Sequence, residues 1–201
     1  MSSIQTTKIL KNLDETTYIS NGVKHREDGP ALLSPLKQEW WVKGQLHRDD
    51  GPARICNNGS ETYYVRGQLH RVDGPAVKLS NGLEEWWVKG QRHRRDGPAY
   101  KFGIQEEWWL NGKLHRTNGP AVSNKIKDEW YEEGERHRTD GPAVIFHMVD
   151  KKVWYINGLK YDTEEEFRHV ITTLRKEVAQ NLYDTKKVCK YVANYITSFV
   201  Y

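Results

Sequence analysis

Several side chains that can do chemistry stand close together in the segment 40–53, which reads WWVKGQLHRDDGPA. Two adjacent tryptophans precede His47, Arg48 and the acidic residues Asp49 and Asp50. A histidine beside carboxylates is the composition of a general acid–base pair or of a metal site. Aromatic rings beside arginine are the composition of a surface that stacks on nucleic acid. The segment alone therefore permits three kinds of site.

The same segment recurs along the chain at an almost constant period. The motif W/Y-x-x-x-G-x-x-H-R-x-D/N-G-P-A occurs six times, and WYINGLKYDTEEEF at 154–167 begins as a seventh copy. Spacings of 22, 23, 23, 22 and 22 residues separate the motif histidines, which are His25, His47, His70, His93, His115 and His137. A constant period over most of a chain indicates a repeat architecture. The copies are numbered repeats 1 to 6 after these histidines.

Repetition weighs against both metal binding and catalysis. Equivalent histidines in successive two-strand repeats would lie roughly 9.5 Å apart, whereas the ligands of one ion approach it to about 2.1 Å. A catalytic site needs one unique convergence of groups. We therefore predict no catalytic residue, no metal site, no cofactor and no enzymatic activity. The histidines and arginines are instead expected to pack on the aromatic rings and to bond turn carbonyls or the aspartate.

The composition narrows the setting and the class of partner. The 201 residues carry a formal net charge of +4, and basic and acidic residues are interspersed. A strong binder of the phosphate backbone normally shows a stripe of one sign. Two cysteines, Cys56 and Cys189, and no apolar leader after Met1 predict an intracellular protein. No apolar run reaches transmembrane length, so no membrane insertion is expected.

Turn residues divide each repeat into strand-like runs. Asn58-Gly59 and Asn81-Gly82 separate alternating apolar runs, which is a strong hairpin signal. In the Asp-Gly-Pro turn we expect the Asp side chain to bond its own backbone and the glycine to take a positive φ. Consecutive hairpins predict a mainly β fold, an antiparallel β-hairpin repeat ribbon or solenoid with a C-terminal helical cap. The predicted parts are cap strands at 1–17, six repeats and a partial seventh at 18–162, and the cap at 163–201.

Strand alternation sorts the aromatic residues into two columns. The inner column, seven residues before each histidine, is expected to form the core; it comprises Tyr18, Trp40, Tyr63, Trp86, Trp108 and Trp130, with Trp154 in the seventh copy. The outer column points to the opposite face, beside Glu39, Glu85, Glu107 and Glu129, and is expected to face water in part. We predict that this column binds the partner together with basic neighbours; the candidates are Trp41, Tyr64, Trp87, Trp109, Tyr131, Lys43, Arg66 and Lys89.

A protein is the partner class that the outer column fits best, because Trp, Tyr and Arg are enriched at binding hot spots. Single-stranded nucleic acid and glycans remain alternatives, since flat rings stack on bases and sugars. The glutamates beside the rings would repel phosphates. A further alternative is that the outer rings only cover their own sheet, in which case the binding surface lies on the His-Arg edge or on the tail.

The tail from residue 163 onward has a helical pattern. Thr163 followed by Glu166 is a capping box, and apolar residues from Phe167 to Leu182 follow helical spacing. Asp184-Thr185 is expected to break the helix before a second one. The tail is predicted to cover the last edge of the ribbon, and the second helix leaves oligomerisation open.

The motif resembles the MORN-type repeat variants of large DNA viruses and bacteriophages over about residues 16–167. The repeated HRxDGPA carries this resemblance, together with the closing YINGLKYDTEEEF. It implies a β-hairpin ribbon, a viral or phage origin, and a host factor as the partner, in the host cytoplasm if the protein is viral. It implies no chemistry. The standard MORN pattern lacks the His-Arg and Asp-Gly-Pro elements, so the phospholipid binding of some MORN proteins is not carried over.

Overall fold

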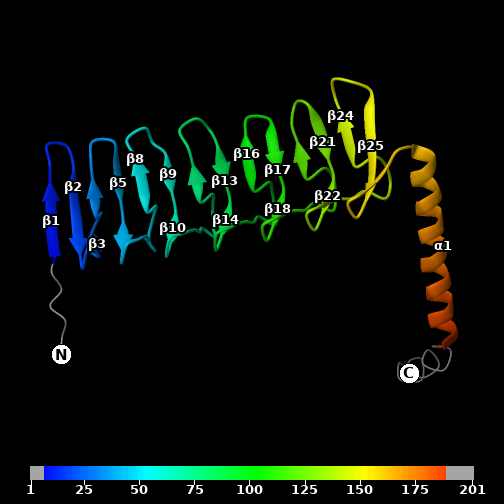
Figure 1. Cartoon of the computed structure of the whole chain (residues 1–201), viewed down its shortest axis with the longest axis horizontal. Coiled ribbons are helices and arrows are strands. Elements are labelled where there is room, and N and C mark those ends of the chain that lie inside the picture. Colours follow the sequence, from blue (N-terminus) through cyan, green and yellow to red (C-terminus); the bar gives the residue numbers. More distant parts are fainter. Residues whose placement is uncertain (1–6, 189–201) are drawn as a thin grey trace, which may run out of the picture.

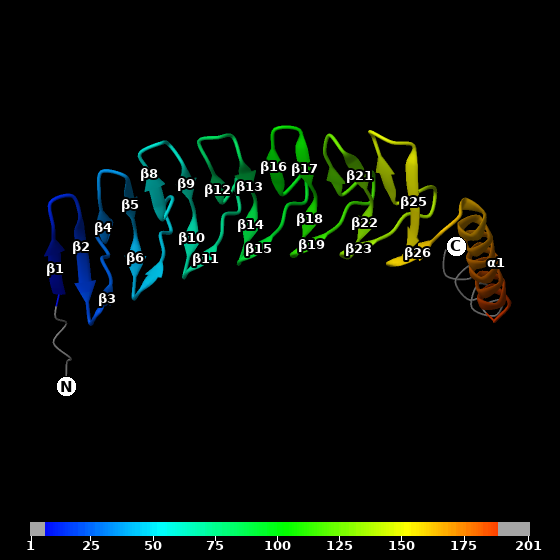
Figure 2. The same cartoon turned by 45° about the horizontal axis from the view of Figure 1, so that its top comes forward.

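The computed structural model is an elongated ribbon of β-hairpins that ends in one helix (Figure 1). It describes residues 7–188. Successive hairpins lie side by side in chain order, so neighbours in the sequence are also neighbours in space (Figures 1 and 2). The predicted antiparallel hairpin ribbon with a helical cap is confirmed.

One antiparallel sheet of sixteen strands runs the length of the ribbon. Its strands follow the chain in space, and only β3 pairs off the path, with β2. The strands are β1 (Thr7–Lys11), β2 (Thr16–Ser20), β3 (Val23–Lys24), β4 (Leu32–Leu33), β5 (Lys37–Glu39), β8 (Arg54–Cys56), β9 (Glu61–Thr62), β12 (Val77–Lys78), β13 (Glu84–Glu85), β16 (Tyr100–Phe102), β17 (Gln105–Glu107), β20 (Val122–Ser123), β21 (Lys127–Glu129), β24 (Val144–Phe146), β25 (Lys151–Ile156) and β26 (Leu159–Tyr161).

Five short hairpins extend the sheet at its lower edge, one in each of repeats 2 to 6 (Figure 2). They contain the outer aromatic residue and the two residues before the motif histidine. The two residues before the motif histidine thus belong to strands and not to the connection that ends in Asp-Gly-Pro. The pairs are β6 (Trp41–Val42) with β7 (Gln45–Leu46), β10 (Tyr64–Val65) with β11 (Gln68–Leu69), β14 (Trp87–Val88) with β15 (Gln91–Arg92), β18 (Trp109–Leu110) with β19 (Lys113–Leu114), and β22 (Tyr131–Glu132) with β23 (Glu135–Arg136).

The lower hairpins turn through two consecutive residues with positive φ, as in a type I′ turn. In β6–β7, for example, Lys43 has φ 49° and Gly44 has φ 76°. Asn and Gly favour such positions, whereas a lysine, arginine or glutamate there is strained. The predicted basic neighbours of the outer column therefore lie in turns and not on the strand face beside that column. They are Lys43, Arg66 and Lys89.

The buried hydrophobic residues form rows across the sheet. The alanine of every motif is 0% exposed, and its carbonyl oxygen accepts a bond of 2.7–2.8 Å from the backbone N–H of the inner-column residue beside it. On the opposite face the buried residues include Leu32, Val77, Val122 and Val144. Register pairs Leu32 with Glu39 and Val122 with Glu129, so these side chains share the face of the outer column. The outer column is half-buried, in agreement with the expectation that it faces water in part. The inner column is also half-buried, so the prediction that it forms the buried core is wrong.

A single helix, α1 (Glu164–Val188), follows the seventh partial repeat. The capping box is confirmed, because the Thr163 hydroxyl accepts the Glu166 N–H at 3.2 Å and the Glu166 carboxylate accepts the Asp162 N–H at 3.1 Å. The predicted break at Asp184-Thr185 is wrong, since helical hydrogen bonding continues to Val188. The rest of the predicted second helix lies outside the described residues.

The first turns of α1 cover the end of the ribbon. Phe167 and Ile171 are buried against Ile156, with Trp154 and Tyr161 packed around them. Phe167 meets the Tyr161 ring edge to face, with centroids 6.3 Å apart. This arrangement supports the predicted capping role, since the apolar end of the seventh copy would otherwise face water.

Replacing Phe167 with alanine should lower the free energy of unfolding by about 3 kcal/mol, because the ring is 4% exposed. Leu174→Ala on the same helix should cost less than about 1 kcal/mol, because Leu174 is 40% exposed. Urea unfolding of both variants measures the difference. Equal losses would show that α1 does not seal the ribbon through Phe167.

Candidate binding surface

The motif arginine organises one face of the ribbon, called here the Arg face. In every repeat its guanidinium Cζ lies 3.9–4.2 Å from the centroid of the inner-column ring, as Arg48 does over Trp40 at 4.1 Å. At this distance the cation meets the negative face of the ring. The predicted stacking of the arginine on an aromatic ring is confirmed.

The Asp-Gly-Pro turn holds the arginine in that position. Arg48 Nε donates to Asp50 at 2.8 Å, and its Nη1 donates to the Pro52 carbonyl oxygen at 3.5 Å. The arginine donates to the proline carbonyl oxygen in all six repeats. Hydrogen bonds from the arginines lower the pKa of Asp28, Asp50, Asp73, Asp96 and Asp140. Asn118 replaces the aspartate in repeat 5, where Arg116 still stacks on Trp108 at 3.9 Å.

Glycine is needed in this turn for space and not for a positive φ. Among the glycines of the Asp/Asn-Gly-Pro turn only Gly119 has a left-handed φ, of 133°, so the prediction for Gly51, Gly74, Gly97 and Gly141 is wrong. A Cβ added at Gly97 would lie 2.6 Å from Arg94 Cζ, well inside contact distance. The stacked guanidinium passes over the turn, and any side chain there would displace it.

The motif histidine couples each repeat to the next. Its Nδ1 accepts the backbone N–H of the first turn residue of the following hairpin, at 3.0–3.2 Å in all six repeats. His47, for example, accepts from Arg66. The arginine N–H donates to the carbonyl oxygen of the next outer-column residue, as Arg48 does to Tyr64 at 3.0 Å. The histidines therefore have a structural partner that the sequence pattern does not reveal.

The opposite face, called here the Glu face, holds the predicted partner-binding column. The indole N–H groups of Trp41, Trp87 and Trp109 donate to the glutamates two residues earlier at 2.7–3.0 Å. Arg92 lies over both Trp87 and Trp109 and is bonded to Glu85 at 2.7 Å. The outer rings thus contact their own sheet closely, which favours a covering layer over a free binding column.

The glutamates of this face are structural charges. Glu39 is 1% exposed and accepts from Lys37 at 2.9 Å, Trp41 at 3.0 Å and Arg54 at 2.8 Å. Burial raises the pKa of Glu39, but the hydrogen bonds from Lys37 and Trp41 and the charge of Arg54 outweigh burial and hold it below its ordinary value. The carboxylate is therefore ionised in the folded protein at neutral pH.

Only one position of the HRxD/NGPA segment is both exposed and different in nearly every copy. This variable position, between the arginine and the aspartate, holds Glu27, Asp49, Val72, Arg95, Thr117 and Thr139. Glu27 and Asp49 have side chains 79% and 81% exposed, and Val72 is 81% exposed. The histidine and arginine of this segment have the same structural partners in all six repeats, whereas this position can change without loss of the fold.

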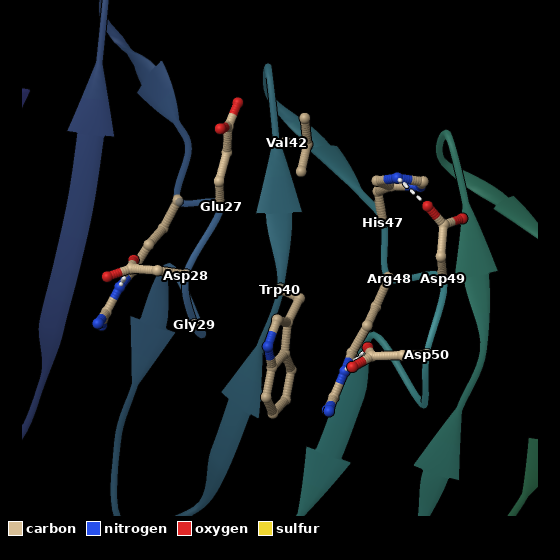
Figure 3. A pocket seen from close by; sticks show the side chains of 10 residues that line it. Glu27, Asp28, Gly29, Trp40, Val42, His47, Arg48, Asp49 and Asp50 are labelled. Atoms are coloured by element: carbon tan, nitrogen blue, oxygen red, sulfur yellow. Dashed lines mark hydrogen bonds and ion pairs between the residues drawn. The ribbon is translucent and has the colours of Figure 1, made fainter.

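Open pockets lie on the Arg face between consecutive repeats (Figure 3). The first has a volume of about 550 Å³ and lies between Arg26, Glu27 and Asp28 of repeat 1 and Trp40, His47 and Asp49 of repeat 2. Figure 3 shows Trp40 beside Arg48, with Glu27 on one side of the pocket and Asp49 on the other. An equivalent pocket of about 550 Å³ separates repeats 3 and 4 and is lined by Val72, Trp86 and Arg95.

No group of three or more His, Cys, Asp or Glu side chains in residues 7–188 could hold a metal ion. No helix of the described chain is long and apolar enough to cross a membrane. A comparison with protein-family models finds no match, and a comparison with curated proteins also finds none. The chemistry of the surface itself must therefore indicate the function.

Gly97→Ala should lower the free energy of unfolding by about 1–2 kcal/mol, because the new methyl group displaces Arg94 from Trp86. In an Arg94→Ala background the same substitution should cost less than about 0.5 kcal/mol, because nothing is displaced. Chemical denaturation of wild type, Gly97→Ala, Arg94→Ala and the double variant gives the coupling free energy between the two substitutions. Equal costs in both backgrounds would mean that the glycine is required for its backbone conformation.

Glu39→Gln should lower the free energy of unfolding by about 1–2 kcal/mol at neutral pH, since Lys37 and Arg54 lose their ionised partner. Both cations are about a third exposed, which keeps the loss below that of a fully buried pair. The pKa of Glu39 is lower in the folded protein than in the unfolded chain. The stability that the ionised carboxylate contributes is therefore complete above the unfolded glutamate pKa of about 4.3, and it is lost as the pH falls through the pKa of Glu39 in the folded protein.

Denaturation of wild type and Glu39→Gln at pH 7 and pH 3 measures this effect, with the exposed Glu165→Gln as control. The gap between wild type and Glu39→Gln should be smaller at pH 3 than at pH 7, and the control should show no such change. A gap that is unchanged at pH 3 would contradict the proposed role of the ionised carboxylate.

Proposed function

We propose that the protein is a non-enzymatic scaffold that binds another protein along the Arg face of its ribbon. The observation that carries this proposal is the variable position. Within the HRxD/NGPA segment the conserved residues hold the turn, while one exposed side chain changes from acidic to apolar to basic to polar along the ribbon. A row of different side chains on a constant frame is suited to reading a heterogeneous surface, and proteins present such surfaces.

The mixed charge of the row argues against a polyanionic ligand. Glu27 and Asp49 would repel phosphates at one end, whereas Arg95 would attract them further along. A nucleic-acid strand repeats the same charge at every nucleotide, so a binding surface for it needs the same sign in each repeat. Catalysis would require different groups brought to one centre. A protein segment, with its own sequence of charges, fits this row better than either.

Single-stranded nucleic acid and glycan remain the second candidate, through the half-buried outer rings. Trp87 and Trp109 keep part of each ring accessible, and flat rings bind bases or sugars by stacking. The two candidates differ in their response to salt. Phosphate binding weakens steeply as salt rises, while glycan binding does not.

The resemblance to viral and phage repeats supports a host protein as the natural partner. The direct test is affinity capture from infected host lysate with the full chain, identification by mass spectrometry, and titration of the purified captured protein. Saturable binding that changes little between 50 and 300 mM salt supports the proposal. Capture of nucleic acid alone, with an affinity that falls at least tenfold over that range, would replace it with the second candidate.

Two tryptophan double variants test which face binds. Trp87→Ala with Trp109→Ala and Trp86→Ala with Trp108→Ala should each lower stability by several kcal/mol, about 2 kcal/mol or more per ring, because both columns are half-buried and stacked with arginine. From the sequence pattern alone we expect a smaller loss of stability for the outer pair. Melting and partner binding of the folded fraction are the measurements.

The outer pair should leave partner binding by the folded fraction within about twofold of wild type, because these rings lie on the Glu face, opposite the Arg face. A loss of about 2 kcal/mol or more in binding from the outer pair, with modest loss of stability, would instead restore the outer column as the hot spot.

A further inference from the structure

We infer that the Arg face binds its partner as a peptide segment in the polyproline II conformation, with one partner side chain opposite the variable residue of each of repeats 1 to 4 in a fixed order of charge. This inference rests on the proposed function and specifies its ligand. The carrying observation is that the pockets between repeats 1 and 2 and between repeats 3 and 4 have the same volume and the same frame but different walls.

The spacing of the repeats matches one turn of a polyproline II helix. Two strands per repeat, each about 4.8 Å from the next, set a rise of roughly 9.6 Å. A segment in the polyproline II conformation has three residues per turn and advances about 3.1 Å per residue, so one turn spans roughly 9.3 Å. Every third side chain of such a segment points the same way and therefore meets an equivalent position of the next repeat. A helix, at 1.5 Å per residue, would need more than six residues for the same step.

The pocket between repeats 1 and 2 is suited to a cation. Two of its acids, Asp28 and Asp50, are paired with the stacked arginines at 2.7 and 2.8 Å. Glu27 and Asp49 have only histidine as an ionisable partner, at 3.7 and 3.4 Å, and are mostly exposed. Two carboxylates beside the Trp40 ring, which lines the pocket, provide charge attraction and a surface on which a lysine or arginine side chain packs.

The pocket between repeats 3 and 4 has the opposite character. Its stacked arginines are again paired with Asp73 and Asp96, at 3.0 and 3.2 Å. The remaining wall groups are the exposed Val72 and Arg95. An apolar side chain fits against Val72, and an acidic one is attracted to Arg95. Repeats 5 and 6 present threonines, so the charge code is concentrated in the first four repeats.

Helix α1 ends the groove. The last pocket lies between repeat 6 and α1. It is lined by Trp154 and by Phe167, Arg168 and Ile171 of α1, which take the place of the stacked arginine and turn of a further repeat. The partner segment is thus confined to the groove of repeats 1 to 6. The expected ligand has two basic residues, an apolar residue and an acidic residue, three positions apart, opposite Glu27, Asp49, Val72 and Arg95.

The probe is a fluorescein-labelled decapeptide, Lys-x-x-Lys-x-x-Leu-x-x-Glu, with serine or threonine at x. It is synthesised in this order and in the reversed order, because the groove does not fix the chain direction. The control peptide has the same composition with its acidic residue and second lysine exchanged, so that in either direction a lysine stands opposite Arg95. Fluorescence anisotropy with the full chain in 150 mM salt should show at least tenfold tighter binding of one probe than of the control.

Charge exchange in the groove should exchange the preference. The variant Glu27→Lys, Asp49→Lys, Arg95→Glu should bind Glu-x-x-Glu-x-x-Leu-x-x-Lys, or its reverse, at least tenfold more tightly than it binds the original probe. Asp14→Lys, at a hairpin tip, changes the net charge by the same amount and should keep the wild-type preference. Thermal melting confirms that each variant is folded.

Equal binding of probe and control peptides, no binding of any probe up to millimolar concentration, or an unchanged preference in the charge-exchanged variant would overturn the inference. The proposed function fails separately. If the wild-type chain captures and titrates a protein that the charge-exchanged variant binds equally well, the scaffold function stands and the groove is not its site. If no protein binds the wild-type chain, the function itself is wrong.

Discussion

Each repeat depends on one interaction, the motif arginine stacked between an aromatic ring and a tight turn. The guanidinium covers a ring that would otherwise expose its flat face, and its N–H groups bond the aspartate and the proline carbonyl oxygen of the same turn. Glycine leaves the space through which the guanidinium passes. A single-layer sheet has no second layer to cover it, so this folded-back side chain supplies part of the cover.

The coupling between repeats depends on backbone groups more than on side-chain packing. The motif histidine accepts the N–H of a residue whose φ is near 50°, a conformation that lysine, arginine and glutamate adopt at some cost. The next hairpin can therefore hold its strained turn because the preceding repeat provides an acceptor. Such nearest-neighbour coupling is the general basis of cooperativity in repeat proteins.

The two faces of the sheet divide structure from recognition. On the Glu face, buried carboxylates bond the indole N–H groups and the arginines, so charged residues beside the outer rings stabilise the sheet. On the Arg face, pockets recur between repeats, and the residue that changes in nearly every copy stands at their rims. Both faces carry aromatic and charged residues. Only their contacts distinguish a covering layer from an open groove.

The period, the hairpins, the capping box and the stacking of arginine on the inner ring could all be predicted from the sequence, because each depends on local spacing or on residues within one motif. Three features could not. Glu39 and Trp41 lie two apart on one strand, and nothing in that spacing shows that Arg54 from the next strand neutralises the carboxylate and allows its burial. His47 bonds a backbone N–H nineteen residues away, which leaves no mark in residue type. Gly97 is needed because Arg94 crosses its turn, whereas the local pattern predicted a backbone requirement. In each case the deciding partner comes from a neighbouring strand, a neighbouring repeat or a side chain folded back over the chain, and only the tertiary structure brings these groups together.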